Sequence, residues 1–389
     1  MRLPDRPLNL VPASVRDYRE LARRRLPRQM FDYIDGGAYE ESTLAANEAD
    51  LHAIQLRQRV LRDVSSVHLG TTVLGVDLAL PVVLAPVGLA GMFAPRAEVQ
   101  AARAAESHGV SFCESTVSIA GIEEVAAATT RPFWYQLYVM KDRSYAEDLM
   151  ARATAAGCPV LVLTVDLPVV GERYRDERNA MVGSPPPLAK IRRGLDLVTH
   201  PRWIRDVALG GKPHTFGNLV KAVPDADNPR DFKSYVDANF DASVSWDDLA
   251  WVREHWSGKL VIKGVLDADD ARTAVDHGVD GIVVSNHGGR QLDDTPSTIR
   301  ALAPIADAVG DQLDVLVDGG IRSGLDVVKA LAVGAKACLI GRAWAYAVAG
   351  AGEAGVSHVL EIIAKEMAVA MSLTGVTDVA DLSEDILVR

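Results

Sequence analysis

The stretch Val283-Val284-Ser285-Asn286-His287-Gly288-Gly289-Arg290-Gln291-Leu292-Asp293 joins an apolar run to a polar, glycine-rich loop. Short apolar runs are typical of strands buried in a parallel sheet, and this one ends at Ser285. The loop then presents His287, which suits proton transfer near neutral pH, and Arg290, which can hold a carboxylate by paired hydrogen bonds. A lone histidine in a loop is usually structural. Its position directly after a strand, beside an arginine and two glycines, favours a catalytic role.

Seven more runs of this kind occur along the chain, so the strand pattern is found eight times. The runs are Val82–Ala85, Val110–Cys113, Phe133–Leu137, Val160–Val165, Leu260–Ile262, Gly281–Val284, Val315–Val317 and Ala337–Ile340. Helical patterns, each followed by a glycine, fill several of the gaps between them. These patterns are Arg96–His108, Tyr145–Ala156, Ala268–His277 and Leu325–Val333. The alternation predicts an α/β fold, a (β/α)8 TIM barrel, whose active site lies at the C-terminal ends of the strands.

The remaining residues extend this barrel within what we expect to be one domain of residues 1–389. Its expected parts are an N-terminal helical segment (1–80), the barrel (81–360), a long insertion after the fourth strand (176–243) and a C-terminal helix and tail (361–389). The insertion is expected because the distance from Asp166 to Leu260 is too long for one crossover. In the N-terminal segment, Val15–Arg25 is predicted to be a helix. Residues 31–37, Phe-Asp-Tyr-Ile-Asp-Gly-Gly, lead either to the mouth or to the base of the barrel.

The insertion contains a basic segment with interspersed apolar residues, although the whole chain has a net charge of −11. Residues 188–212 contain six basic residues and only two acidic ones, Asp196 and Asp206. The six are Lys190, Arg192, Arg193, Arg202, Arg205 and Lys212. Such a segment suits an anionic membrane surface. It is equally compatible with a solvated lid over the active site.

The composition argues against several other classes of protein. An acidic chain lacks the basic footprint of a protein that binds nucleic acid. The three cysteines, Cys113, Cys158 and Cys338, are far apart and no Cys/His cluster occurs, so we expect neither a disulfide framework nor a metal site. The uncharged stretch Leu78–Ala94 is short and contains prolines and glycines, which indicates a buried strand and a loop rather than a membrane span.

Two neighbouring strand ends near the C-terminus predict a phosphate site. One strand runs into Asp318-Gly319-Gly320-Ile321-Arg322, and the next ends in Gly341-Arg342. Loops after the last two strands are the usual phosphate site of this barrel, because glycine amides and arginines can surround a phosphomonoester there. No P-loop occurs and no GxGxxG motif follows a strand, so a nicotinamide Rossmann domain is not expected.

Three other strand ends carry groups that have two interpretations each. Lys263 could neutralise an anionic cofactor ring, or form a salt bridge in the barrel mouth. Asp166 could stabilise a protonated catalytic histidine, or cap the following element. Tyr138 could bind a substrate oxygen, or pack at the rim. The spacing of the sequence assigns no role to Tyr33 or Arg173.

The nonapeptide Ser285-Asn-His-Gly-Gly-Arg-Gln-Leu-Asp293 resembles the signature of the FMN-dependent L-2-hydroxy acid oxidase and dehydrogenase family. The resemblance covers nearly the whole chain, from Tyr18 to the C-terminal region. It includes Phe31-Asp-Tyr-Ile-Asp-Gly-Gly-Ala38, Gln136-Leu-Tyr-Val139, Leu163-Thr-Val-Asp166, Val261-Ile-Lys-Gly264, Asp318-Gly-Gly-Ile-Arg322 and Ile340-Gly-Arg342. Within the family, the chain is most similar to bacterial respiratory L-lactate dehydrogenases. The stretches that carry this similarity are Ala85-Pro-Val-Gly-Leu-Ala-Gly-Met92, Ser115-Thr-Val-Ser118, Gly171-Glu-Arg-Tyr-Arg-Asp176 and Val198-Thr-His-Pro-Arg202.

The resemblance implies an FMN cofactor and a role for each residue of the site. His287 would take a proton from the substrate while two electrons pass to the flavin, and Asp166 would stabilise the resulting imidazolium. The substrate would be bound by Tyr33, Tyr138, Arg173 and Arg290. The flavin ring would be contacted by Pro86, Val87, Gly88, Ser115, Gln136, Thr164, Lys263 and Ser285. The phosphate end would be contacted by Asp318, Gly319, Gly320, Arg322, Gly341 and Arg342.

The implied reaction is the oxidation of a small L-2-hydroxy acid, L-lactate to pyruvate, with a quinone or a cytochrome of the respiratory chain as electron acceptor. The implied partners also include an anionic membrane surface on the cytoplasmic face of the plasma membrane, and further copies of the chain in a homo-oligomer, a tetramer. The location is cytoplasmic if the insertion is only a lid. Two rival functions are a soluble oxidase that returns electrons to oxygen, and an FMN barrel that isomerises a phosphorylated substrate.

Three positions depart from what the family pattern leads us to expect. Val117 stands where plant-type glycolate oxidases carry tryptophan, which leaves the size of the substrate open. Gly88 stands where many oxidases of the family carry alanine, which favours a dehydrogenase. Glu114 stands where a small or apolar residue is expected, and nothing in the sequence explains it.

Overall fold

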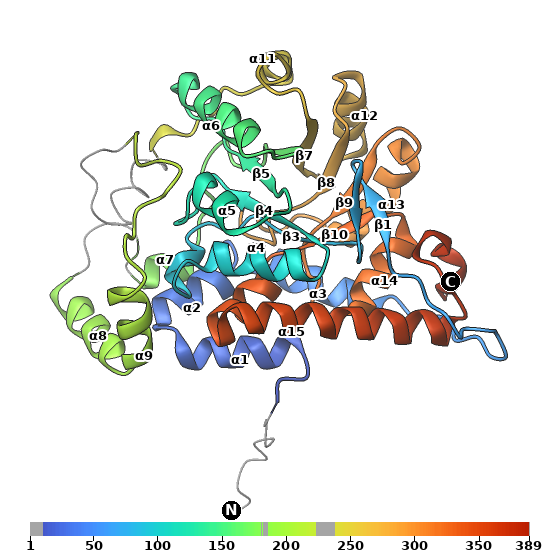
Figure 1. Ribbon diagram of the computed structural model, residues 1–389, viewed down its shortest axis with the longest axis horizontal. Coiled ribbons are helices and arrows are strands. Elements are labelled where there is room, and N and C mark those ends of the chain that lie inside the picture. Colours follow the sequence, from blue (N-terminus) through green and yellow to red (C-terminus); the bar gives the residue numbers. More distant parts are fainter. Residues whose placement is uncertain (1–10, 180, 182–185, 223–237, 389) are drawn as a thin grey trace, which may run out of the picture.

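The computed structural model describes residues 11–179, 181, 186–222 and 238–388. Eight parallel strands close into a barrel in the order β10-β3-β4-β5-β6-β7-β8-β9 (Figure 1). The strands are β3 (Val82–Leu84), β4 (Ser111–Ser115), β5 (Trp134–Leu137), β6 (Val160–Thr164), β7 (Lys259–Val265), β8 (Gly281–Val284), β9 (Asp314–Val317) and β10 (Ala337–Ile340). Each of the eight predicted runs overlaps one of these strands. The prediction of a (β/α)8 barrel is therefore confirmed.

Side chains fill the inside of the barrel and close its base. Val83, Cys113 and Trp134 belong to the buried cluster of the interior. The antiparallel hairpin of β1 (Thr71–Val73) and β2 (Val76–Leu78) joins the same cluster and lies at the start of β9, where the backbone N–H of Leu74 donates to Asp314 at 2.6 Å. Because this hairpin covers the N-terminal ends of the strands, the opposite end remains for a ligand site.

Helices surround the barrel and cover its outer face (Figure 1). They are α1 (Val15–Arg25), α2 (Arg28–Asp35), α3 (Ser42–Ala53), α4 (Ala97–Ser107), α5 (Ile122–Ala128), α6 (Arg143–Ala155), α11 (Asp248–His255), α12 (Ala268–Asp276), α13 (Thr298–Val309), α14 (Gly324–Val333) and α15 (Arg342–Thr374). Short 3-10 turns are η1 (Ala90–Met92), η3 (Val379–Asp381) and η4 (Glu384–Ile386). The predicted helix over 15–25 is confirmed. It lies alongside α15, which loses helical geometry at Ala351 and Gly352 and also packs against α4 and α14.

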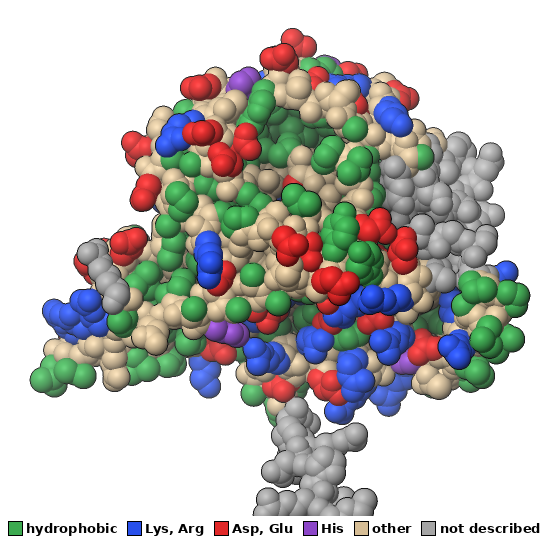
Figure 2. Space-filling view, turned by 180° about the vertical axis from the view of Figure 1, so that it is seen from behind, with side chains coloured by type: hydrophobic (Ala, Val, Ile, Leu, Met, Phe, Trp, Pro, Cys, Tyr) green, Lys and Arg blue, Asp and Glu red, His purple; other side chains and the backbone are tan. Residues whose placement is uncertain are grey.

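The described part of the insertion forms a projecting corner of the molecule. It contains α7 (Tyr174–Arg178), α8 (Pro187–Val198), α9 (Pro201–Trp203) and the π-helical turn η2 (Ile204–Leu209). Residues 180, 182–185 and 223–237 of the predicted insertion lie outside the described residues. Helix α8 has no buried residue and exposes Leu188, Ile191, Leu195 and Val198. Apolar and basic side chains meet on this corner, at the lower right of Figure 2. Within the described ranges, no helix combines the length and the apolar composition needed to cross a membrane.

Two strands extend further than the apolar runs predict. Strand β4 continues to Ser115, so Glu114 lies within the strand. Strand β7 continues to Val265, so Lys263 lies inside the strand rather than at its end. A register shift between Lys263 and Val265, at Gly264, bends this strand edge. Bulges of this kind change the direction of neighbouring side chains and are common beside active sites.

Candidate active site

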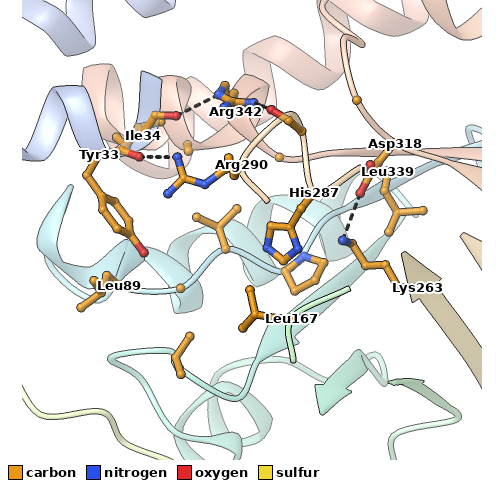
Figure 3. Close-up of a pocket in the computed structure, with 18 of the residues that line it drawn as sticks. Tyr33, Ile34, Leu89, Leu167, Lys263, His287, Arg290, Asp318, Leu339 and Arg342 are labelled. Atoms are coloured by element: carbon orange, nitrogen blue, oxygen red, sulfur yellow. Dashed lines mark hydrogen bonds and ion pairs between the residues drawn. The ribbon is translucent and has the colours of Figure 1, made fainter. Parts of the chain in front are cut away.

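A cavity of about 1250 Å3, including its open mouth, lies at the C-terminal ends of the barrel strands (Figure 3). Fifteen of the twenty predicted site residues line it: Tyr33, Pro86, Val87, Gly88, Tyr138, Arg173, Lys263, His287, Arg290, Asp318, Gly319, Gly320, Arg322, Gly341 and Arg342. The other five, Ser115, Gln136, Thr164, Asp166 and Ser285, lie at or just beyond the ends of β4, β5, β6 and β8. The structure therefore brings the whole predicted set to one end of the barrel.

His287 lines this cavity and is paired with Asp166, and both side chains are only partly exposed, at 20% and 12%. The Nδ1 atom of His287 lies 2.9 Å from Oδ1 of Asp166. His287 has a left-handed backbone with a φ of 56°, and its N–H donates to Oγ of Ser285 at 3.0 Å, so the ring direction is fixed from two sides. Because Nδ1 faces the carboxylate, Nε2 is the ring nitrogen left for a ligand.

The electrostatics of this pair favour a neutral imidazole beside an ionised carboxylate. Burial lowers the pKa of His287 below its ordinary value of 6.5; Asp166 opposes this shift, while the positive charges of Lys263 and Arg173 add to it. Burial would raise the pKa of Asp166, but the interaction with His287 and the charge of Lys263 hold it below its usual value. A neutral histidine next to a carboxylate is the state in which it can accept a proton.

Gly264 makes room for Asp166. Its φ is +117°, and a Cβ atom there would lie 2.6 Å from Cβ of Asp166. The bulge at this glycine thus allows the β7 backbone to approach the carboxylate closely.

Lys263 places a buried positive charge at the same end of the barrel. Its Nζ donates to Oγ of Ser285 at 3.1 Å and lies 3.4 Å from Oδ2 of Asp318 (Figure 3). Burial would lower the pKa of Lys263, but the carboxylates of Asp318 and Asp166 raise it overall. The lysine therefore stays charged. It forms the salt bridge that is one of the two interpretations from the sequence, and it also lines the cavity, so its role toward a cofactor ring stays a prediction.

Two arginines lie on the N-terminal segment's side of the cavity. Arg290 donates from Nη1 to the carbonyl oxygens of Tyr33 and Gly36 at 2.7 and 2.8 Å, and its guanidinium lies 5.0 Å from the Tyr33 ring centroid (Figure 3). Arg173 donates from Nε to the carbonyl oxygen of Arg290 at 3.3 Å. These contacts show that residues 31–37 reach the mouth of the barrel and not its base.

The positive charges of Arg173 and Arg290 are available to bind an anion. Neither Arg173 nor Arg290 forms a salt bridge with an acidic side chain of the described residues. Burial and the neighbouring Arg173 lower the pKa of Arg290 to about 9. A carboxylate bound between the two would relieve their mutual repulsion and form charge-assisted hydrogen bonds.

The phosphate end of the cavity lies where β9 and β10 end. Arg342 begins α15 and donates to the carbonyl oxygens of Ile34, Gly36 and Gly288 at 2.8 to 2.9 Å (Figure 3). Arg322 lies 3.0 Å from Oε1 of Glu48. Two guanidinium groups beside the positive N-terminus of a long helix suit a phosphate group.

Buried polar atoms in the wall provide a test of whether a flavin fits. Nε2 of Gln136 and Oγ1 of Thr164 are buried and have no partner within the described part of the chain. Such atoms are costly unless a ligand or water satisfies them. A flavin has carbonyl and N–H groups on one edge of its ring, which could satisfy these two atoms. Arg322 and Arg342 at the other end of the cavity suit its phosphate, so the residues present fit FMN.

Several wall residues had no signal in the sequence. Phe216 and Phe240, from the end of the insertion, line the cavity together with Leu89, Leu167 and Val170. Val117 and Gly88 also line it and touch each other: a Cβ atom on Gly88 would lie 2.6 Å from Cγ2 of Val117. The apolar wall depends on contacts between distant segments, which explains why no local pattern revealed it.

Comparison with known proteins identifies the family of the chain. A family model described as FMN-dependent dehydrogenase matches residues 22–389. The chain is 58% identical over 378 residues to L-lactate dehydrogenase of Caulobacter vibrioides (97% of this chain, 98% of the relative) and 52% identical over 380 residues to that of Alcaligenes faecalis (98% and 100%). Among solved structures, the monotopic membrane protein (S)-mandelate dehydrogenase has a TM-score of 0.91 at 36% identity, covering 97% of this chain and 99% of its own. Mandelate oxidase has a TM-score of 0.80 at 38% identity, covering 95% and 96%. The chain belongs to the FMN-dependent dehydrogenase family, and FMN is its cofactor.

Proposed function

We propose that this protein oxidises a small L-2-hydroxy acid, and that L-lactate, converted to pyruvate, is the substrate. The observation that carries the proposal is His287, paired with Asp166, in one cavity with Arg173 and Arg290. A base beside two arginines that form no salt bridge within the described residues fits a molecule with a hydroxyl group next to a carboxylate. The names of the relatives matched over nearly their full length support lactate as that molecule.

The residues of the site divide the chemistry among them. Arg173 and Arg290 bind the carboxylate of the acid, and Tyr33 and Tyr138 bind its oxygens. His287 takes a proton at Nε2, and Asp166 stabilises the imidazolium that forms. Bound FMN supplies the acceptor for the two electrons that leave the α-carbon.

A second group of residues holds the cofactor. Arg322 and Arg342 bind its phosphate, and the buried Gln136 and Thr164 side chains bind the polar edge of its ring. Lys263 keeps a positive charge beside that ring. The other predicted residues, Pro86, Val87, Gly88, Ser115 and Ser285, would hold the ring, and Asp318, Gly319, Gly320 and Gly341 would complete the site for the phosphate end.

Anaerobic mixing with a panel of acids tests the proposal. We expect L-lactate to bleach the flavin, and glycolate and mandelate to bleach it less well. His287→Gln should keep the yellow flavin and lose bleaching, because the amide cannot accept the proton. Normal bleaching in this variant would remove His287 from the mechanism, and no bleaching of the wild type by any of the acids would reject the function.

The electron acceptor is a respiratory quinone or a cytochrome in our proposal. Reoxidation of the lactate-reduced protein should be faster with a quinone than with oxygen. Stoichiometric peroxide in air, without quinone, would identify an oxidase instead. The protein is also proposed to be a homo-oligomer, a tetramer, which the molar mass by light scattering decides.

Helix α8 attaches the protein to the cytoplasmic face of the plasma membrane in our proposal. Its Leu188, Ile191 and Leu195 are 59 to 65% exposed, and basic side chains of the same helix flank them. An exposed apolar face of this kind suits the interface of an anionic bilayer. Replacing the three by serine should abolish sedimentation with vesicles that contain anionic lipid, whereas serine at Val60 and Leu61, also exposed apolar residues, should not. Equal loss in both variants, or in neither, would reject this role of α8.

A further inference from the structure

Glu114 is a buried acid with no part in the mechanism above. It lies in β4, is 0% exposed, and its Oε1 accepts from Nδ2 of Asn218 at 3.1 Å, while Oε2 has no partner in the described part of the chain. Burial raises the pKa of Glu114 well above its usual value, and the nearby Glu98 carboxylate adds to this although the Asn218 bond opposes it. Burying a polar pair of this kind costs free energy, but a hydrogen bond between two buried side chains also fixes the segments that carry them relative to each other.

Asn218 comes from the insertion and connects it to three parts of the barrel. Its Nδ2 also donates to the carbonyl oxygen of Ser115 at 3.2 Å, at the end of β4. Its Oδ1 accepts from the backbone N–H of Ile122 at 2.9 Å, at the start of α5, and from Nη2 of Arg152 on α6 at 3.4 Å. With an exposure of 1%, this side chain lies buried where the insertion meets the barrel and contributes several of the hydrogen bonds there.

The residues on either side of Asn218 reach the active site. Phe216 is buried and lines the cavity, and Leu219 packs in the same apolar cluster as Tyr138 and Phe240. Between them, the backbone N–H of Gly217 donates to the carbonyl oxygen of Ser118 at 3.1 Å. A shift of Asn218 would therefore shift Phe216 relative to the cavity.

The wall that contains Phe216 lines the same cavity as His287 and Arg290. Leu89 and Leu167, two members of this wall, lie across the cavity from the Arg290 guanidinium in Figure 3. If the carboxylate of the acid lies at Arg290 and its hydroxyl at His287, the third substituent of the α-carbon is directed to the apolar wall. Apolar walls of this kind discriminate by about 10- to 200-fold for each methyl or methylene group.

We propose that Glu114 and Asn218 are a positioning pair that holds Phe216 against the side chain of the acid, and so sets the preference for acids with an apolar side chain over glycolate, which has none. The proposal rests on the proposed function. Neither residue touches the substrate; both act through Phe216.

Steady-state kinetics with L-lactate and glycolate test the pair. For Asn218→Ala we expect the ratio of kcat/KM for lactate to that for glycolate to fall about tenfold, mainly through KM for lactate. Phe216→Ala should lower the same ratio, because it removes the wall directly. The kcat/KM of glycolate is measured directly. If glycolate turns over too slowly, its inhibition constant in the lactate assay is measured instead. FMN content and the melting temperature are measured for every variant.

The Glu114 variants separate positioning from stability. Glu114→Ala should lower the ratio as Asn218→Ala does, and the double variant should lower it no further, because the two residues act as one unit. Glu114→Gln should keep the ratio, because an amide oxygen still accepts from Asn218. If Asn218→Ala does not fold, Asn218→Leu serves instead: it has a similar size and can neither donate to Glu114 nor accept from it, so the ratio should again fall. A lower melting temperature with an unchanged ratio would overturn the proposal, whereas wild-type protein that oxidises neither acid would reject the function itself.

Discussion

Replacing Asp166 by asparagine removes one charge from the site and little else. Asparagine keeps an oxygen where Oδ1 of Asp166 accepts from His287, and its amide nitrogen takes the place of Oδ2, which has no partner in the described residues. The ring of His287 should therefore keep its position. What is lost is the negative charge that stabilises the imidazolium after proton transfer.

The structure gives the size of this loss. Opposite charges about 4 Å apart, in surroundings with an effective dielectric constant of about 20, attract each other by about 4 kcal/mol. The Nδ1–Oδ1 distance of 2.9 Å places the two charges within that range. Because about 1.4 kcal/mol corresponds to a factor of ten in rate, we expect flavin reduction by L-lactate to slow by roughly 10³-fold.

Anaerobic stopped-flow measurement of flavin bleaching at saturating L-lactate checks this value. The matched controls are the FMN content and the melting temperature of Asp166→Asn, both of which should stay close to those of the wild type. A rate constant within tenfold of the wild type, with FMN bound, would show that Asp166 does not stabilise the protonated histidine. Another group would then have to stabilise the protonated His287.

Two further outcomes are expected from the same site. The value of kcat/KM for lactate should decrease as the pH is lowered, with a midpoint below 6.5, because burial lowers the pKa of His287 and the base must be neutral to react. In Asp166→Asn the midpoint should lie at a still lower pH, because Asp166 raises the pKa of His287. A midpoint above 6.5 in the wild type would contradict a neutral His287 in the resting protein. Gly264→Ala should lower the free energy of unfolding by about 2 kcal/mol more than Gly278→Ala does, and it should also slow flavin reduction. Both glycines have a positive φ, but a Cβ atom at Gly264 would collide with Asp166, whereas nothing lies within 4 Å of a Cβ atom at Gly278. Equal losses of stability in denaturant titrations would show that the close approach of Gly264 to Asp166 does not matter.

Local sequence patterns predicted the barrel and brought most of the predicted site residues to one end of it. Each strand is a short apolar run, and most of the predicted catalytic and cofactor-binding residues lie in the last positions of a strand or within a few residues after it, as His287 follows β8 and Arg342 follows β10. In a parallel barrel all strand ends meet at one face, so residues far apart in the chain could be placed together without knowing any distance. The same reasoning failed at Lys263, because the bulge at Gly264 depends on the neighbouring strand and not on the run itself.

Contacts between distant segments were decided only by the tertiary structure. Tyr33 and Arg173 look like ordinary loop residues, and they join the site because α2 and the loop after β6 fold over the barrel mouth. The buried Glu114 has no explanation until Asn218, 104 residues away, is seen to donate to it. Apolar periodicity reports which face of a segment is buried, because burial depends on each residue's own hydrophobicity. It does not report which segment supplies the partner, because that depends on the path of the whole chain.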